Sequence, residues 1–187
     1  DLNGKIDMVV DGGAAEWGLE STIVDLTEGI PTILRPGYIT GKMLQDVLGA
    51  VRVDPGIQSE ESHARPKAPG MRYRHYAPRA PLTIVDGQEQ KVIDYINEQI
   101  REAGLQGKKA GVIATEETKE AYLASVVLPV GERSDEEGIA RHLFDILRRF
   151  DDTDVDEIYS ESFETPNLGQ AIMNRLLKAA GHRVIKV

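Results

Sequence analysis

The fold is decided by a stretch that runs from Leu82-Thr83-Ile84-Val85, through the helical pattern of residues 90–103, to Ala110-Gly111-Val112-Ile113-Ala114. Its two ends are short apolar runs typical of buried strands. Between them, four aliphatic residues form one apolar stripe at helical spacing, and Gly104 is expected to end the helix. Two buried strands joined by a helix predict a parallel pair, because parallel strands need a long crossover connection.

The alternation of strands and helices continues to the C-terminus. A Ser134-x-x-Glu137 capping box predicts the start of a helix, and Gly181 predicts the end of another. Strands that alternate with helices indicate an α/β fold, here a Rossmann-like, mostly parallel open sheet with flanking helices over residues 81–187. The further helices are expected at 116–123, 134–150 and 168–180, and the further strands at 125–129, 157–160 and 183–187.

Residues 1–51 predict a less complete set of elements. About 50 residues bury too little surface to be stable alone, so we expect this segment to be the C-terminal part of a larger α/β domain. Residues 52–80 are expected to be an extended linker, because their prolines disfavour helices and sheet interiors. Within the first segment, strands are expected at 6–10, 22–26 and 32–35 and a helix at 40–48.

A basic run lies inside the expected linker. Residues 65–79 carry five basic and no acidic side chains, in a chain of formal net charge -9. Such a run suggests a loop that meets an anion, with Tyr73 and Tyr76 stacking on a base while Arg72, Arg74 or His75 contacts phosphates. Two alternatives stay open, a solvated charged face and a segment that holds RNA.

Two further side chains are candidates for ligand contacts. Ser21 stands with Thr22 at the entrance of an apolar strand, and hydroxyls there can donate hydrogen bonds to carboxylate or phosphate oxygens. Arg35 ends another strand, and its planar guanidinium suits phosphate. The alternatives are a plain turn at Ser21 and a surface ion pair at Arg35.

The composition restricts the other possibilities. The chain is 41% hydrophobic and 28% charged, which is ordinary for a soluble globular protein. It has no run of about 18 apolar residues and no signal-peptide pattern at its start, so a cytoplasmic protein is expected. There is no cysteine, and the four histidines show no ligand spacing, so we expect no structural metal. The P-loop motif is absent from the sequence as well.

Four motifs follow one another along nearly the whole chain. They are Gly18-Leu19-Glu20-Ser21-Thr22-Ile23-Val24-Asp25, Ile33-Leu34-Arg35-Pro36-Gly37-Tyr38-Ile39-Thr40, Ala68-Pro69-Gly70-Met71-Arg72-Tyr73-Arg74-His75-Tyr76-Ala77-Pro78 and Asn167-Leu168-Gly169-Gln170-Ala171-Ile172-Met173-Asn174-Arg175-Leu176. Together they resemble the threonylcarbamoyl-AMP synthases in their long form, in which a YrdC-like catalytic domain is joined by a linker to a smaller Rossmann-like domain. The last motif resembles the final helix of that second domain.

The resemblance implies a nucleotidyltransferase that condenses L-threonine, bicarbonate and ATP into threonylcarbamoyl-AMP, releasing pyrophosphate, for N6-threonylcarbamoyladenosine formation in tRNA. By motif position, Ser21 would meet the threonine or the acyl phosphate, and Arg35 would hold ATP phosphates. Tyr76, with Arg74 and His75, would close over the nucleotide. Mg²⁺ is expected with ATP, although no ligand for it can be named. Partner proteins of tRNA modification are a further expectation.

The sequence also departs from this family. The Lys-x-Arg and Ser-x-Asn elements that grip ATP there are absent from this chain, so we expect residues 1–51 to be the C-terminal fragment of the catalytic domain and the chain alone to be inactive. The alternative function is a non-catalytic regulatory, tRNA-docking or partner-docking module. A polar pocket at the strand carboxyl ends would favour ligand binding, and a filled one would favour a scaffolding role. Direct tRNA binding is not expected, because five charges are a small footprint.

Overall fold

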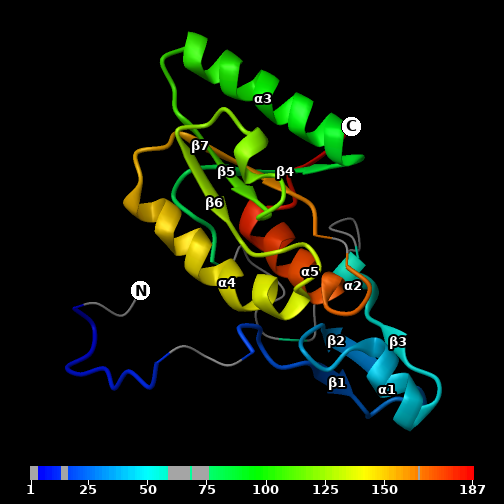
Figure 1. Cartoon of the computed structure of the whole chain (residues 1–187). Helices are drawn as coiled ribbons and strands as arrows, with labels where there is room; N and C mark the ends of the chain where they lie inside the picture. Colours follow the sequence, from blue (N-terminus) through cyan, green and yellow to red (C-terminus); the bar gives the residue numbers. More distant parts are fainter. Residues whose placement is uncertain (1–3, 14–16, 59–67, 69–75, 164) are drawn as a thin grey trace.

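The computed structural model of the chain describes residues 4–13, 17–58, 68, 76–163 and 165–187 (Figure 1). The strands within these residues form two sheets, one of three strands in the order β1-β2-β3 and one of five in the order β6-β5-β7-β4-β8. The smaller sheet is built from the first third of the chain, and the larger one from the rest. The junction between them holds the candidate site.

The larger sheet is parallel throughout, which confirms the predicted Rossmann-like fold. All five residues of β5 are buried, as expected for a central strand covered on both faces. Each predicted strand of this region is found, within two residues of the predicted ends. The strands are β4 (Leu82–Asp86), β5 (Ala110–Ala114), β6 (Val126–Pro129), β7 (Glu157–Glu161) and β8 (Val184–Lys186).

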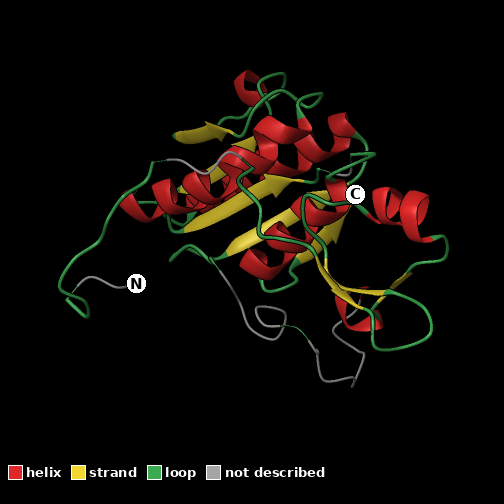
Figure 2. Ribbon diagram, turned by 90° about the horizontal axis from the view of Figure 1, so that it is seen from below, coloured by secondary structure: helices red, strands yellow, loops and turns green. Residues whose placement is uncertain are grey.

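Helices cover both faces of this sheet (Figure 2). Helix α3 (Glu89–Leu105) packs on one face, and α4 (Glu136–Arg149) and α5 (Gly169–Ala180) pack on the other. The alternation of side chains along β4 explains this layering, because Ile84 joins the core under α4 and α5 while Val85 joins the core under α3. The sheet therefore separates two hydrophobic cores.

The helix ends differ from the prediction in three places. Helix α4 is capped by Asp135, whose carboxylate accepts from the Gly138 amide at 2.8 Å, so the predicted Ser134 capping box is wrong. Gly104 lies inside α3 instead of ending it. The helix predicted at 116–123 is only the 3₁₀ turn η1 (Lys119–Ala121), and a second 3₁₀ turn, η2 (Phe150–Asp152), follows α4. Gly181 does end α5, in the left-handed conformation.

The smaller sheet contains β1 (Ile23–Asp25) and β2 (Thr32–Arg35), which are antiparallel, and β3 (Arg52–Val53), which is parallel to β2. It carries helix α1 (Gly41–Leu48), as predicted, and the short helix α2 (Pro55–Gln58). Both β3 and α2 lie beyond residue 51, so the sheet extends into the segment expected to be an extended linker. The division of the chain into domains stays a prediction.

The strand predicted at residues 6–10 is wrong. These residues have no strand structure, and Met8, Val9 and Val10 are all more than 70% exposed. An apolar run becomes a strand only when it finds a partner strand and a surface to pack on. In this structure the segment lies away from both sheets (Figure 1).

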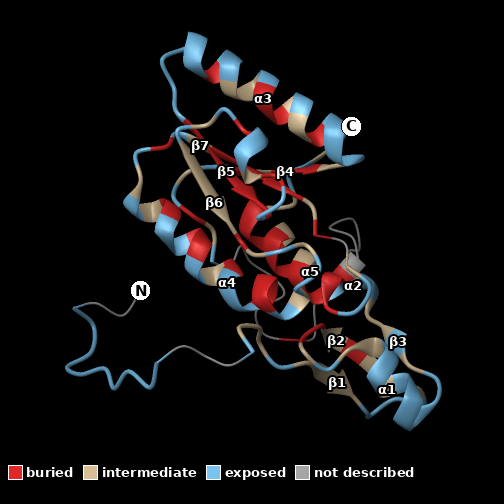
Figure 3. Ribbon diagram, viewed as in Figure 1, coloured by how far each residue is buried: buried red, intermediate tan, exposed pale blue. Residues whose placement is uncertain are grey.

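The segments that flank the smaller sheet are docked on α4. Gly18 has a φ of +64°, and a Cβ atom there would lie 2.2 Å from the Arg141 Cα of α4. Leu19 and Tyr38 pack against the core of the larger sheet, and the Tyr38 hydroxyl donates to Glu137 at 3.2 Å. The turns before β1 and after β2 are thereby held against the second sheet. Figure 3 shows the contrast between the buried α5 and the mostly exposed α1.

Candidate active site

The structure brings Ser21 and Arg35 into direct contact. Ser21 precedes β1, Arg35 ends β2, and the antiparallel pairing places Ile23 opposite Arg35. The Arg35 Nε donates to the Ser21 carbonyl at 3.0 Å, and its Nη2 donates to the Ser21 Oγ at 3.1 Å. Since the Ser21 hydroxyl accepts this bond and the residue is exposed, its own proton is available to a ligand oxygen.

The turn after Arg35 fixes the segment around Ser21. A Cβ atom at Gly37 would lie 2.3 Å from the Glu20 carbonyl oxygen, so only glycine allows the two segments to approach this closely. The Thr22 hydroxyl donates to the Ile39 carbonyl at 2.7 Å. The Thr22 hydroxyl therefore connects the two turns. Of the two adjacent hydroxyls noted in the sequence, Ser21 is the one that remains a candidate for ligand contact.

Arg175 of α5 reaches this site from the other sheet, and the sequence reasoning assigned it no role. Its side chain is only 3% exposed, forms an ion pair with Glu20, and donates from Nη2 to the Pro36 carbonyl at 3.5 Å. The sequence does contain an indication that Arg175 is buried, because this residue lies on the same stripe of α5 as the buried Ala171 and Ala179. A charged residue within an apolar helical stripe indicates a buried ion pair.

The pKa of the Arg175 guanidinium is lowered, chiefly because the group is buried. The positive charge of Arg35 contributes in the same direction, whereas Glu20 and Tyr76 favour the charged form of Arg175. Arg35, Glu20 and Tyr76 therefore all lie within electrostatic range of one buried arginine. We call Glu20, Ser21, Arg35, Tyr76 and Arg175 the junction cluster.

Tyr76 comes to the junction cluster from the segment before β4. Its φ of 59° is in the left-handed region, which is uncommon for a tyrosine. Its ring lies 4.3 Å from that of Phe144 on α4, between centroids, at an interplanar angle of 45°, and the residue remains 41% exposed. Of the predicted nucleotide contacts in this segment, Arg74 and His75 lie outside the described residues.

Within the junction cluster, the Arg35 guanidinium and the exposed Ser21 hydroxyl lie side by side, and this pair favours an anionic ligand. The Arg175 guanidinium is buried and paired with Glu20. The described part of the chain holds no group of three or more His, Cys, Asp or Glu side chains that could bind a metal ion. The one carboxylate of the cluster, Glu20, is already paired with Arg175.

Residues 39–181 match the family described as threonylcarbamoyl-AMP synthase, C-terminal domain. The chain belongs to the threonylcarbamoyl-AMP synthase family. It is 44% identical, over its full length, to the threonylcarbamoyl-AMP synthases of Bacillus subtilis (strain 168) and of Pyrococcus abyssi (strain GE5 / Orsay). It spans about half the length of these relatives, 52% and 53%, and corresponds to their C-terminal part.

A solved threonylcarbamoyl-AMP synthase structure has the same fold. The P. abyssi Sua5 protein, crystallised in complex with L-threonine, superposes with a TM-score of 0.88 at 44% identity, covering 100% of this chain and 53% of that one. The α/β fold and the family expected from the sequence are thereby confirmed. Among the residues of this chain that the structure describes, no helix is both long and apolar enough to cross a membrane.

Proposed function

We propose that this chain supplies the C-terminal part of an enzyme that condenses L-threonine, bicarbonate and ATP into threonylcarbamoyl-AMP and pyrophosphate. The product would serve N6-threonylcarbamoyladenosine formation in tRNA, in the cytoplasm. The family membership and the complex of the P. abyssi relative with L-threonine support this proposal. The observation that carries it for this chain is the contact between Ser21 and Arg35.

In this proposal the two residues act on different parts of the substrates. The Ser21 hydroxyl donates to an oxygen of threonine or of the acyl phosphate, and Arg35 holds phosphate oxygens of ATP. Activation of a carboxylate by ATP builds negative charge on the phosphates, and a pre-positioned guanidinium stabilises that charge. Because Arg35 also holds Ser21 in place, the arrangement would couple the position of threonine to that of the nucleotide.

Tyr76 is proposed to lie over the nucleotide, with Arg74 and His75 as further contacts. The carbamate of threonine and the acyl-adenylate both react with water, so a segment that covers the site would protect them. The exposed ring of Tyr76, already fixed against Phe144, offers a stacking surface at the edge of the junction cluster.

Mg²⁺ would accompany ATP as part of the substrate and be held by phosphate oxygens. The junction cluster does not fit a metal ion, since its only carboxylate is paired with Arg175.

We further propose that the 187 residues alone do not catalyse the reaction. They span about half of each relative, and the Lys-x-Arg and Ser-x-Asn elements are absent from the sequence. A chimera provides the complete protein for a test: the N-terminal half of the B. subtilis relative, which this chain does not match, is joined to these residues.

The test compares Arg35→Gln and Ser21→Ala in that chimera. Arg35→Gln is expected to lower kcat/KM for ATP about 100-fold, the usual effect of losing one charge-stabilising donor. Ser21→Ala is expected to raise the KM for threonine about tenfold, because one hydrogen bond is lost. Pyrophosphate release, measured as a function of each substrate, gives these constants.

Arg52→Gln is the matched control, because Arg52 is an exposed arginine on the same small sheet. It is expected to leave both constants unchanged. If Arg35→Gln behaves like Arg52→Gln while the chimera stays folded and active, Arg35 does not hold ATP and the proposed site is wrong.

A further inference from the structure

A pocket lies at the carboxyl ends of the strands of the larger sheet, and none of its lining residues belongs to the junction cluster. It has a volume of about 220 Å³ and opens between the ends of β4 and β7 and the start of α3. Open α/β sheets bind ligands at this edge. The pocket lining includes Gly87, Glu89, Val92, Tyr122, Arg133 and Ser162, and we call it the sheet-end pocket.

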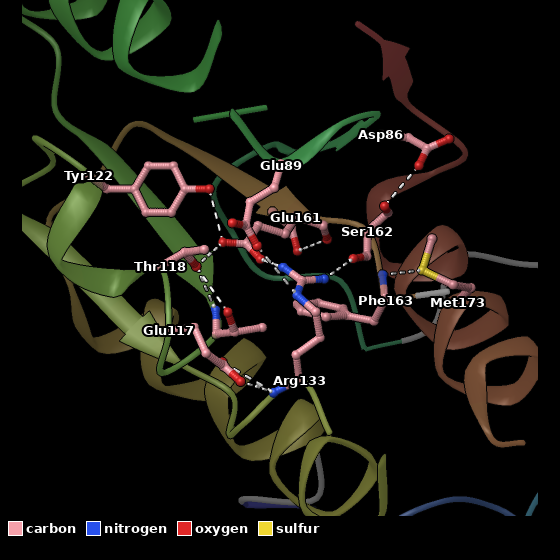
Figure 4. Close-up of polar contacts among 12 residues, drawn as sticks. Asp86, Glu89, Glu117, Thr118, Tyr122, Arg133, Glu161, Ser162, Phe163 and Met173 are labelled. Atoms are coloured by element: carbon pink, nitrogen blue, oxygen red, sulfur yellow. Dashed lines mark hydrogen bonds and ion pairs between the residues drawn. The ribbon is translucent and has the colours of Figure 1, made fainter. Parts of the chain in front are cut away.

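Glu161 forms the fixed base of the sheet-end pocket (Figure 4). Its side chain is 3% exposed and accepts hydrogen bonds from the Thr118 hydroxyl and from the Tyr122 hydroxyl, the latter at 2.9 Å. It also forms an ion pair with Arg133. Burial raises the pKa of Tyr122, and Glu161 raises it further, so this hydroxyl stays protonated and keeps donating. Both Tyr122 and Arg133 are thereby held in place without a ligand.

The charges that remain at the pocket are negative. Arg133 is neutralised by Glu161, and its Nη1 also donates to the Ser162 carbonyl at 3.3 Å. Glu89 is 62% exposed, and it forms only a long ion pair with Arg133, whose Nε lies 3.9 Å from the Glu89 carboxylate. With two carboxylates around the one guanidinium, one negative charge is left over. Asp86 adds a further negative charge behind Ser162. Its carboxylate accepts a hydrogen bond from the Ser162 hydroxyl at 2.8 Å.

These charges decide which ligand fits. The start of α3 would by itself favour a phosphate, but Glu89 occupies its first turn and Asp86 lies close by. A phosphate in the pocket would meet the Glu89 carboxylate, whereas an ammonium group would find an acceptor in it. Val92 and the fixed Tyr122 ring offer apolar and aromatic surface for the carbon chain of such a cation.

We propose that the sheet-end pocket binds a small molecule that carries a primary amine. Its ammonium group pairs with Glu89, and its carbon chain packs on Val92 and the ring of Tyr122. The pocket is smaller than the roughly 300 Å³ at which sites for drug-sized ligands begin, so the ligand is a short amine. The proposal is independent of the reaction at the junction cluster and gives the C-terminal sheet a ligand of its own.

The test is an NMR titration of the 187-residue protein with 1,4-diaminobutane, read at backbone amides. Saturable shifts are expected at Gly87 to Glu89, Tyr122 and Ser162. Glu89→Gln is expected to weaken binding at least tenfold. Glu98→Gln, which removes an exposed carboxylate from the same helix, is expected to leave the affinity unchanged. The amide spectrum of each variant shows directly whether it is folded.

Inorganic phosphate is the opposing probe and is expected to cause no saturable shift at these amides. The proposal is overturned if phosphate saturates the pocket, or if the diamine causes no saturable shift there. It is also overturned if Glu89→Gln and Glu98→Gln bind the diamine equally well, because the binding would then reflect the overall negative charge of the protein.

Discussion

Arg175 shows how one buried charge joins the two sheets. Arg175 lies on α5, which packs on the larger sheet. Its partners, Glu20 and the Pro36 carbonyl, lie in the turns before β1 and after β2. A buried charge is costly unless it is paired, so this contact specifies one docking geometry. The position of Ser21 and Arg35 therefore depends on a residue about 140 positions later in the chain.

We predict that Arg175→Met loosens the smaller sheet. The substitution replaces the charged side chain with an apolar one of similar length, so Glu20 loses its partner and the Pro36 carbonyl loses its donor. The opening free energy of the smaller sheet should fall by about 1–3 kcal/mol. Hydrogen exchange of the β1 and β2 amides measures this change directly.

The control for this prediction is Gln170→Met, at an exposed position of the same helix. It should leave the exchange rates of β1 and β2 as they are. The double variant Glu20→Gln with Arg175→Met should lose less than the sum of the single variants, because the two residues act as a pair. Additive losses would contradict the coupling described for Arg175.

The residues of the site were predictable to different degrees. Ser21 and Arg35 could be singled out, because a hydroxyl and an arginine stood at the ends of apolar strands. Their direct contact depends on the antiparallel pairing of β1 and β2, which the sequence alone does not fix. Arg175 was missed because a buried arginine acquires its role only when the partner segment is known.

At the scale of elements, β4 and β5 were the most predictable strands, because they are largely buried and read as short apolar runs. Helix ends were less predictable, because neighbouring residues compete for the same backbone amides. Asp135 caps α4 in place of Ser134. The run at 6–10 had a strand-like composition but gained no partner, so composition alone misled the prediction.

Two glycines of the larger sheet's helices should respond to alanine in opposite directions. Gly181 ends α5 at a φ of 58°, where a Cβ atom is strained, so Gly181→Ala should lower the free energy of unfolding by about 1–2 kcal/mol. Gly104 lies within α3, and a Cβ atom there would meet no other atom within 4 Å. Gly104→Ala should therefore raise the free energy of unfolding by about 0.5–1 kcal/mol.

Urea unfolding of the two variants, followed by far-UV circular dichroism, provides the measurement. Each glycine serves as the control for the other, since both changes add one methyl group near the C-terminal end of a helix. Equal effects of the same sign would show that the backbone conformations assigned to these glycines are incorrect.

At the scale of the whole molecule, the larger sheet separates two hydrophobic cores, while the smaller sheet has few fully buried residues. Helix α1 illustrates this, because none of its eight residues is buried. The sequence predicted this difference from the sparse elements of residues 1–51. The proposed enzyme needs both the junction cluster of this chain and the ATP-gripping elements that its sequence lacks.

Pyrophosphate release from L-threonine, bicarbonate and ATP tests this account most directly, measured for the 187-residue chain alone and for the chimera with the N-terminal half of the B. subtilis relative. We predict no release above background by the chain alone. We predict release by the chimera that requires all three substrates. Release by the chain alone, or none by a folded chimera, would contradict the proposed function.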